Sequence, residues 1–90
     1  MTTVRIPPVL RAQVGDAKQV QASGETVGQV IGQLVEQHPG LREQLFTPDG
    51  GLNRFVNVYL NGQDVRYLSE LETPVGEQDT LVLLPAMAGG

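Results

Sequence analysis

The residues best suited to chemistry are the last five of the chain, Ala86-Met87-Ala88-Gly89-Gly90, which are small or apolar and carry no charged side chain. Five extended residues reach about 17 Å. The two glycines have no Cβ, so the backbone there can pass through a narrow channel and adopt any φ. An end of this kind would let an enzyme bring the terminal carboxylate onto a nucleotide phosphate.

A carboxylate is a poor electrophile and must be activated before a sulfur donor can attack it. Adenylation converts it to a mixed anhydride, and attack by the donor then gives a thiocarboxylate, which is nucleophilic sulfur held on a protein. A bulky side chain at either terminal glycine would obstruct both reactants. We therefore predict Gly90 as the adenylation and thiocarboxylate site, with Gly89, Ala88 and Met87 as the residues that thread into the partner.

The composition argues against several other classes of protein. The absence of cysteine excludes a disulfide scaffold, a cysteine nucleophile and a thiolate metal site. Six basic residues against ten acidic ones, with no basic run, argue against nucleic-acid binding. No apolar run approaches 18 residues and no secretory stretch opens the chain, so we expect no membrane association and a cytoplasmic location.

The clearest element expected from the sequence is a helix that begins after Thr26. Thr26 and Gln29 fit a capping box, and His38-Pro39-Gly40 should end the helix. Gly28 and Gly32 weaken it, and we hypothesise that they let a sheet approach closely. The apolar residues recur at helical spacing and build one face: Val27, Val30, Ile31, Leu34 and Val35.

Two strands are expected before this helix. The first covers Val4–Arg11, although Pro7-Pro8 interrupts it and requires an unpaired side or a bulge. After a turn at Val14-Gly15-Asp16, residues Lys18–Ala22 alternate as a half-buried strand does, which predicts a hairpin.

Further strands are expected after the helix and one or two additional helical turns at Leu41–Phe46. Arg54–Leu60 is expected to form a strand with Val56, Val58 and Leu60 on one face and Phe55, Asn57 and Tyr59 on the other. Asn61-Gly62 is a strong hairpin signal because both residues tolerate positive φ. Asp64–Leu68 is the expected return strand, and a polar loop follows it. Thr80–Leu84 is apolar in all but its first residue, as a central strand would be.

This order, β-β-α-β-β-β, predicts an α+β protein with the β-grasp (ubiquitin-like) fold, a mixed sheet with one main helix. We expect residues 1–85 to form a single domain and residues 86–90 to be a flexible C-terminal tail.

The chain resembles the ThiS/MoaD family of sulfur carriers, which are ubiquitin-like and end in Gly-Gly. The resemblance covers nearly the whole sequence, and the Arg54–Asn61 and Asp64–Arg66 stretches favour the branch that serves cysteine biosynthesis. Met87 departs from the smaller aliphatic residue expected there, which affects the identity of the partner and not the chemistry. The other matching stretches are Ile6–Arg11, Ala22–Thr26 and Leu84–Gly90.

The resemblance implies a sulfur-carrying co-substrate that is not itself an enzyme and binds no cofactor. An activating enzyme of the MoeB/ThiF type would use ATP to adenylate Gly90, and a sulfur donor would then form the thiocarboxylate. In the cysteine branch the sulfur passes to a cysteine synthase-like acceptor that acts on O-phosphoserine, and a metalloprotease releases cysteine from the tail.

Three alternatives remain open from the sequence. A MoaD-like chain would be the stable small subunit of molybdopterin synthase. A ubiquitin-like modifier would use the same adenylated Gly90 with a lysine as acceptor, although Lys18, the single lysine, limits self-conjugation. A plain interaction domain would not need Gly90 at all.

Weaker candidate sites also appear along the chain. Phe55 and Tyr59 form either a partner-docking patch or a small second core covered by Phe46 and Leu52. His38 has no partner ligand, so we expect a surface or helix-end residue and no metal site. The acidic residues between positions 70 and 79 match no calcium loop and suggest a solvated segment, while Arg54 and Arg66 either steer an acidic partner or flank strands.

Overall fold

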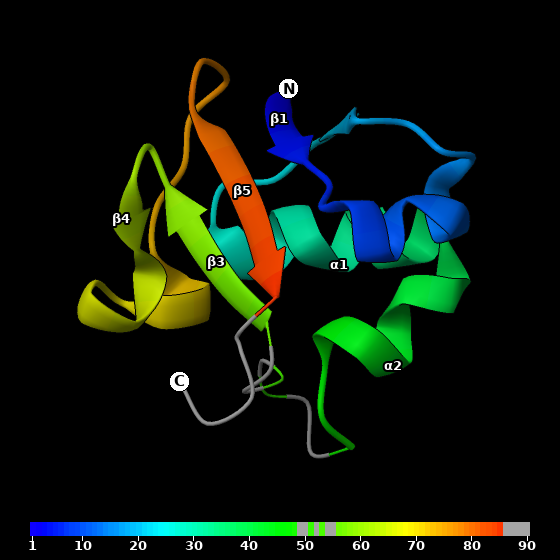
Figure 1. Cartoon of the computed structure of the whole chain (residues 1–90). Coiled ribbons are helices and arrows are strands. Elements are labelled where there is room, and N and C mark those ends of the chain that lie inside the picture. The colour runs from blue at the N-terminus through cyan, green and yellow to red at the C-terminus, as the bar shows by residue number, and fades with distance from the viewer. Residues whose placement is uncertain (49–50, 52, 54–55, 86–90) are drawn as a thin grey trace.

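The computed structural model describes residues 1–48, 51, 53 and 56–85 of the chain (Figure 1). Five strands form one mixed sheet in the order β2-β1-β5-β3-β4. The strands are β1 (Thr2–Arg5), β2 (Gln19–Ala22), β3 (Val56–Leu60), β4 (Gln63–Asp64) and β5 (Thr80–Pro85), and the α-helices are α1 (Val27–Gln37) and α2 (Arg42–Leu45). Short 3-10 helices cover Pro8–Val14, Pro39–Leu41, Val65–Tyr67 and Glu70–Glu72. The predicted β-grasp order is therefore confirmed.

Strand β5, the last in the sequence, lies at the centre of the sheet (Figure 1). It runs parallel to β1, with Val4 opposite Leu81, and antiparallel to β3, with Val58 opposite Leu83. A strand paired on both sides has no free edge. Thr80–Val82 are therefore held from both sides, whereas the end of the strand, Leu83–Pro85, is paired with β3 alone.

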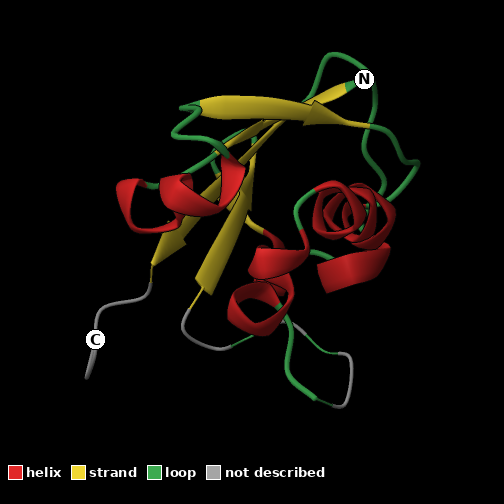
Figure 2. Ribbon diagram, turned by 90° about the vertical axis from the view of Figure 1, so that its right-hand side faces the viewer, coloured by secondary structure: helices red, strands yellow, loops and turns green. Residues whose placement is uncertain are grey.

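The hydrophobic core lies between the sheet and α1, which Figure 2 shows on one side of the sheet and nearly end-on. Leu81 and Leu83 of β5 are fully buried, whereas Val82 is half-buried and Leu84 is 43% exposed. This alternation is the period of two that a strand imposes. The α1 residues that close the core are those of the predicted apolar face: Val27, Val30, Ile31, Leu34 and Val35.

The start of α1 is held by the predicted capping box. The backbone N–H of Gln29 donates to Oγ1 of Thr26 at 3.2 Å. The side chain of Gln29 reaches back one residue further than the standard motif, where its Oε1 accepts from the backbone N–H of Glu25 at 2.9 Å. Both bonds satisfy donors that precede or open the helix and have no partner within it.

The prediction of a first strand that extends to Arg11 is wrong. Strand β1 ends at Arg5, and a 3-10 helix covers Pro8–Val14. Proline fixes φ near the helical value and has no N–H to donate, which suits the first helical position and not a ladder. The helix ends at Gly15 in the left-handed conformation (φ 67°), inside the predicted turn.

The predicted return strand at Asp64–Leu68 is also largely wrong. The hairpin itself is confirmed, with φ of 50° at Asn61 and 91° at Gly62, but β4 stops after two residues. The Oδ1 of Asp64 accepts from the backbone N–H of Arg66 at 2.9 Å, and this bond caps the 3-10 helix Val65–Tyr67. A side chain that accepts from a nearby backbone N–H in this way competes with the hydrogen bonds of a strand ladder.

The two helix glycines do not admit the sheet, contrary to the sequence hypothesis. A Cβ on Gly28 would lie 3.0 Å from the carbonyl oxygen of Leu71, which belongs to the 3-10 helix Glu70–Glu72. A Cβ on Gly32 would meet no other atom within 4 Å. Gly28 thus permits the polar loop to pack on α1, and Gly32 lies beside open space.

The entry to β5 is tied to the β3–β4 turn through Asn61. Its side chain donates to Oδ1 of Asp79 at 2.9 Å and accepts from the backbone N–H of Thr80 at 3.0 Å. The Asn61 bond and a second one from the backbone N–H of Gly76 lower the pKa of the Asp79 carboxyl. The polar loop before β5 is therefore anchored at its end.

Candidate functional site

The described part of the candidate site is the end of β5, from which the predicted reactive tail begins. Pro85 is the last described residue of the strand and lies opposite Val56, the first residue of β3. Because proline has no N–H, the backbone donates no hydrogen bond at this position. We call this point, Val56 and Pro85, the tail root.

Arg66 fastens the β3 side of the tail root. Its Nη2 donates to the carbonyl oxygen of Val56 at 3.2 Å. Strand β4 pairs only with Tyr59 and Leu60 and so stops short of Val56. The guanidinium therefore donates to a β3 carbonyl that β4 does not reach. Of the two roles predicted for Arg66, this bond favours the one in which it flanks a strand.

The face of the sheet opposite α1 carries a group of side chains beside the tail root, which we call the outer patch. The register places Arg5, Val82 and Tyr59 in one row across β1, β5 and β3, and Leu84 and Asn57 in the next row. Residues directly opposite one another share a face and contact one another. Arg5 is exposed and Leu84 is 43% exposed, while the other three are half-buried.

The predicted site residues are distributed as follows. Tyr59 lies half-buried in the outer patch, and its docking role stays a prediction. Phe55, its predicted companion, lies outside the described residues. The same holds for the covering residue Leu52, for Arg54 and for the four tail residues Met87, Ala88, Gly89 and Gly90. Asn57 was not singled out from the sequence, because only the folded register shows that it lies opposite Leu84.

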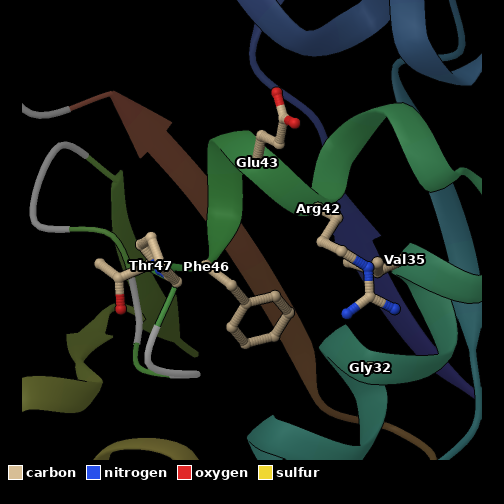
Figure 3. Close-up of a pocket in the computed structure, with 7 residues that line it drawn as sticks. Gly32, Val35, Arg42, Glu43, Phe46 and Thr47 are labelled. Atoms are coloured by element: carbon tan, nitrogen blue, oxygen red, sulfur yellow. The ribbon is translucent and has the colours of Figure 1, made fainter.

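The alternative covering role of Phe46 does not fit its position. Phe46 is half-buried, packs against the main core and lines a groove of about 670 Å³ between α1 and α2 (Figure 3). Tyr59 alternates with the core residue Val58 and so lies on the other face of the sheet. The groove residues are Gly32, Val35, Arg42, Glu43, Phe46, Thr47 and Pro48.

The described residues bring together no group of three or more His, Asp or Glu side chains able to hold a metal ion. His38 forms the C-cap of α1, where its backbone N–H donates to the carbonyl oxygen of Leu34. The side chains of Glu70, Glu72 and Glu77 are exposed, as the solvated-loop interpretation predicts, whereas Asp79 is half-buried and accepts hydrogen bonds from Asn61 and Gly76. None of the described helices has the length and apolar character needed to cross a membrane.

A mixed sheet with a central last strand, packed on one main helix, defines a ubiquitin-like (β-grasp) protein. The comparison with protein families agrees with this class: the model of the ThiS family matches residues 4–90. The chain belongs to the ThiS family, and it is a sulfur carrier and not an enzyme.

Two relatives illustrate the similarity. The sulfur carrier protein CysO of Mycobacterium tuberculosis is 46% identical over 90 residues, which cover 98% of this chain and 97% of the relative. The crystal structure of the Amycolatopsis orientalis BexX/CysO complex contains a chain that is 43% identical, with a TM-score of 0.91 and complete coverage of both chains.

A further relative is named as a modifier and not as a sulfur carrier. The small archaeal modifier protein 3 of Haloferax volcanii is 35% identical over 65 residues, which cover 72% of this chain and 70% of the relative. The family similarity thus extends to proteins named as carriers and to proteins named as modifiers.

Proposed function

We propose that this carrier holds sulfur as a thiocarboxylate on Gly90 and donates it for cysteine biosynthesis. The observation that carries the proposal is the central strand β5, which leads at Pro85 into five residues that end in Gly89-Gly90. The 46% identity to CysO over nearly the full chain supports the cysteine pathway.

The proposed loading proceeds in two balanced steps. The Gly90 carboxylate attacks the α-phosphate of ATP on a MoeB/ThiF-type enzyme, so that an acyl adenylate forms and pyrophosphate leaves. Sulfide from the sulfur donor then attacks the acyl carbon, AMP leaves, and the thiocarboxylate remains.

On a cysteine synthase-like acceptor, the thiocarboxylate sulfur bonds to the β-carbon of the serine unit of O-phosphoserine and phosphate leaves, so that cysteine is held on Gly90 as a thioester. The thioester rearranges to an amide when the cysteine amine attacks the same acyl carbon. A metalloprotease then hydrolyses this amide, which releases cysteine and restores the Gly90 carboxylate.

Incubation with a MoeB/ThiF-type enzyme, ATP and sulfide should raise the intact mass of the chain by about 16 Da, because one carboxylate oxygen is exchanged for sulfur. Fragmentation should place the added mass on Gly90. Omission of ATP is the control, since an unactivated carboxylate does not react with sulfide. An unchanged mass, with an enzyme that loads another ThiS-family carrier, would contradict the proposal.

We propose further that the activating enzyme docks on the outer patch. Leu84 supplies exposed apolar surface and the half-buried Tyr59 supplies part of an aromatic ring, and surface of this kind anchors protein interfaces. The patch lies beside the tail root, so a protein docked on it is within the roughly 17 Å that residues 86–90 span when extended. That a relative occurs in a complex with a named partner supports docking by this family.

Substitution Leu84→Lys should raise the KM of the carrier in adenylation at least tenfold, because a charged side chain cannot be buried in an apolar interface without a partner. Thermal unfolding should change little, since Leu84 is already 43% exposed. The matched control is Gln21→Lys, an exposed position on β2, and should leave KM unchanged. Steady-state release of pyrophosphate measures both variants. An unchanged KM for Leu84→Lys would exclude docking on this patch.

The second candidate function is a protein modifier, which the match to small archaeal modifier protein 3 favours. The adenylated Gly90 would then react with a lysine amine of a target. Isopeptide-linked products in extracts supplied with the activating enzyme and ATP would support this function. Thiocarboxylate without such products would favour the carrier role alone.

A further inference from the structure

Asn57 occupies an unusual position in the outer patch. It lies on β3 between Val56 and Val58, whose side chains are buried on the opposite face of the sheet, and it faces Leu84 across the ladder. Leu84 immediately precedes Pro85, so Asn57 is among the side chains nearest to the tail root. The sequence in this region is otherwise that of an ordinary half-buried strand.

The Oδ1 atom of Asn57 is buried and accepts no hydrogen bond from the described part of the chain. Buried polar atoms are almost always paired, and an acceptor without a donor lowers the stability of a fold. Asn61, only four residues away, uses both polar atoms of its side chain at 2.9 and 3.0 Å. An apolar side chain of similar shape would suit the Asn57 position better in the isolated domain.

The location of this unpaired acceptor suggests that it pairs with a donor when another protein docks. It lies in the surface on which the activating enzyme is proposed to dock, between the half-buried Tyr59 and the exposed Leu84. Rotation about the Cβ–Cγ bond moves Oδ1 without any change in the backbone. A donor on a docked protein would therefore satisfy an atom that the free chain leaves unsatisfied.

We propose that Asn57 is a positioning residue for tail loading: its side-chain oxygen accepts a hydrogen bond from the docked activating enzyme. This inference rests on the docking proposed above. The bond exists only in the complex and fixes the enzyme relative to the tail root. It is present before and throughout adenylation, so it acts on KM and not on kcat.

Substitution Asn57→Leu tests the proposal, because stability and loading should change in opposite directions. We expect a higher unfolding temperature than that of the unmodified chain, since the unpaired acceptor is removed. We also expect an approximately tenfold higher KM in adenylation with kcat unchanged, since one intermolecular hydrogen bond is lost. A residue with only a structural role would not produce this pair of effects.

Substitution Asn57→Asp is the conservative partner in the test. Its carboxylate retains acceptor oxygens, so KM should remain within about threefold of the unmodified value, although partial burial of a charge should lower the unfolding temperature. Gln21→Leu, an exposed outer-face position on β2, is the matched control and should not change KM.

A lower unfolding temperature for Asn57→Leu, or an unchanged KM, would overturn the inference. Leu84→Lys, measured in the same assay, separates this failure from that of the docking proposal. If Leu84→Lys raises KM and Asn57→Leu does not, the patch docks the enzyme without the Asn57 contact. If neither variant raises KM, docking on the patch is also wrong.

Discussion

Deletion of Gly89 and Gly90 is expected to abolish sulfur loading while the domain unfolds at the same temperature as the complete chain. The buried core of the described residues extends from Val4 to Leu83, and deletion of two glycines removes no apolar side chain. Without them the terminal carboxylate belongs to Ala88, which has a Cβ. The tail is then two residues shorter, so this carboxylate would not reach the nucleotide bound to the activating enzyme. Intact-mass measurement after reaction with the activating enzyme, ATP and sulfide should detect no added sulfur.

A second variant tests whether the reactive carboxylate must belong to Gly90. One alanine appended after Gly90 keeps both glycines and moves the carboxylate one residue further, onto a residue with a side chain. This variant should also fail to load and should unfold like the unmodified chain. A deletion variant that unfolds several degrees lower would show that the tail is structural and would contradict the proposed role of Gly90.

Alanine at two adjacent leucines of β5 should have very different effects on stability. Leu83→Ala should destabilise the domain by about 2–5 kcal/mol, because it leaves a cavity beneath α1 at a fully buried position. Leu84→Ala should cost less than about 1 kcal/mol, because this side chain is 43% exposed on the opposite face. Urea denaturation measures both free energies of unfolding.

In the loading assay the same two variants should show the opposite order, with the larger effect at Leu84. Leu84→Ala should raise the KM of the carrier, since it removes apolar surface from the outer patch, whereas folded Leu83→Ala should keep a normal KM. A domain of this size has a total stability of about 5–15 kcal/mol, so Leu83→Ala is best assayed at low temperature. Equal losses of stability at the two positions would contradict the observed facing of β5.

The elements that the sequence predicted well are those whose ends carry their own local signals. Thr26 and Gln29 mark the start of α1 through bonds between near neighbours, and the pair Asn61-Gly62 defines a turn that needs positive φ. Pro7-Pro8 interrupts the first apolar segment, but Val9 and Leu10 favour a strand there. The helical preference of a proline at the first position prevailed, and Leu10 and Val14 contribute to the core from a 3-10 helix.

The candidate site likewise has a part that the sequence predicts and a part that only the structure shows. Gly89 and Gly90 were evident from the sequence, because their chemistry depends on residue type and on their position at the end of the chain. The outer patch required the register, which brings Tyr59 opposite Val82 and Asn57 opposite Leu84. No sequence pattern identifies an unpaired acceptor such as that of Asn57, because pairing depends on which atoms of distant segments surround it.

The position of β5 also determines how the domain resists mechanical force. Strand β1, at the other end of the chain, lies beside β5 and runs in the same direction. Tension applied between Met1 and Pro85 therefore shears the β1–β5 ladder, so its hydrogen bonds share the load and must break together instead of opening one after another. A molecular motor that pulls on the C-terminal end while the N-terminus is held would therefore meet its greatest resistance at the start of unfolding, when this ladder breaks.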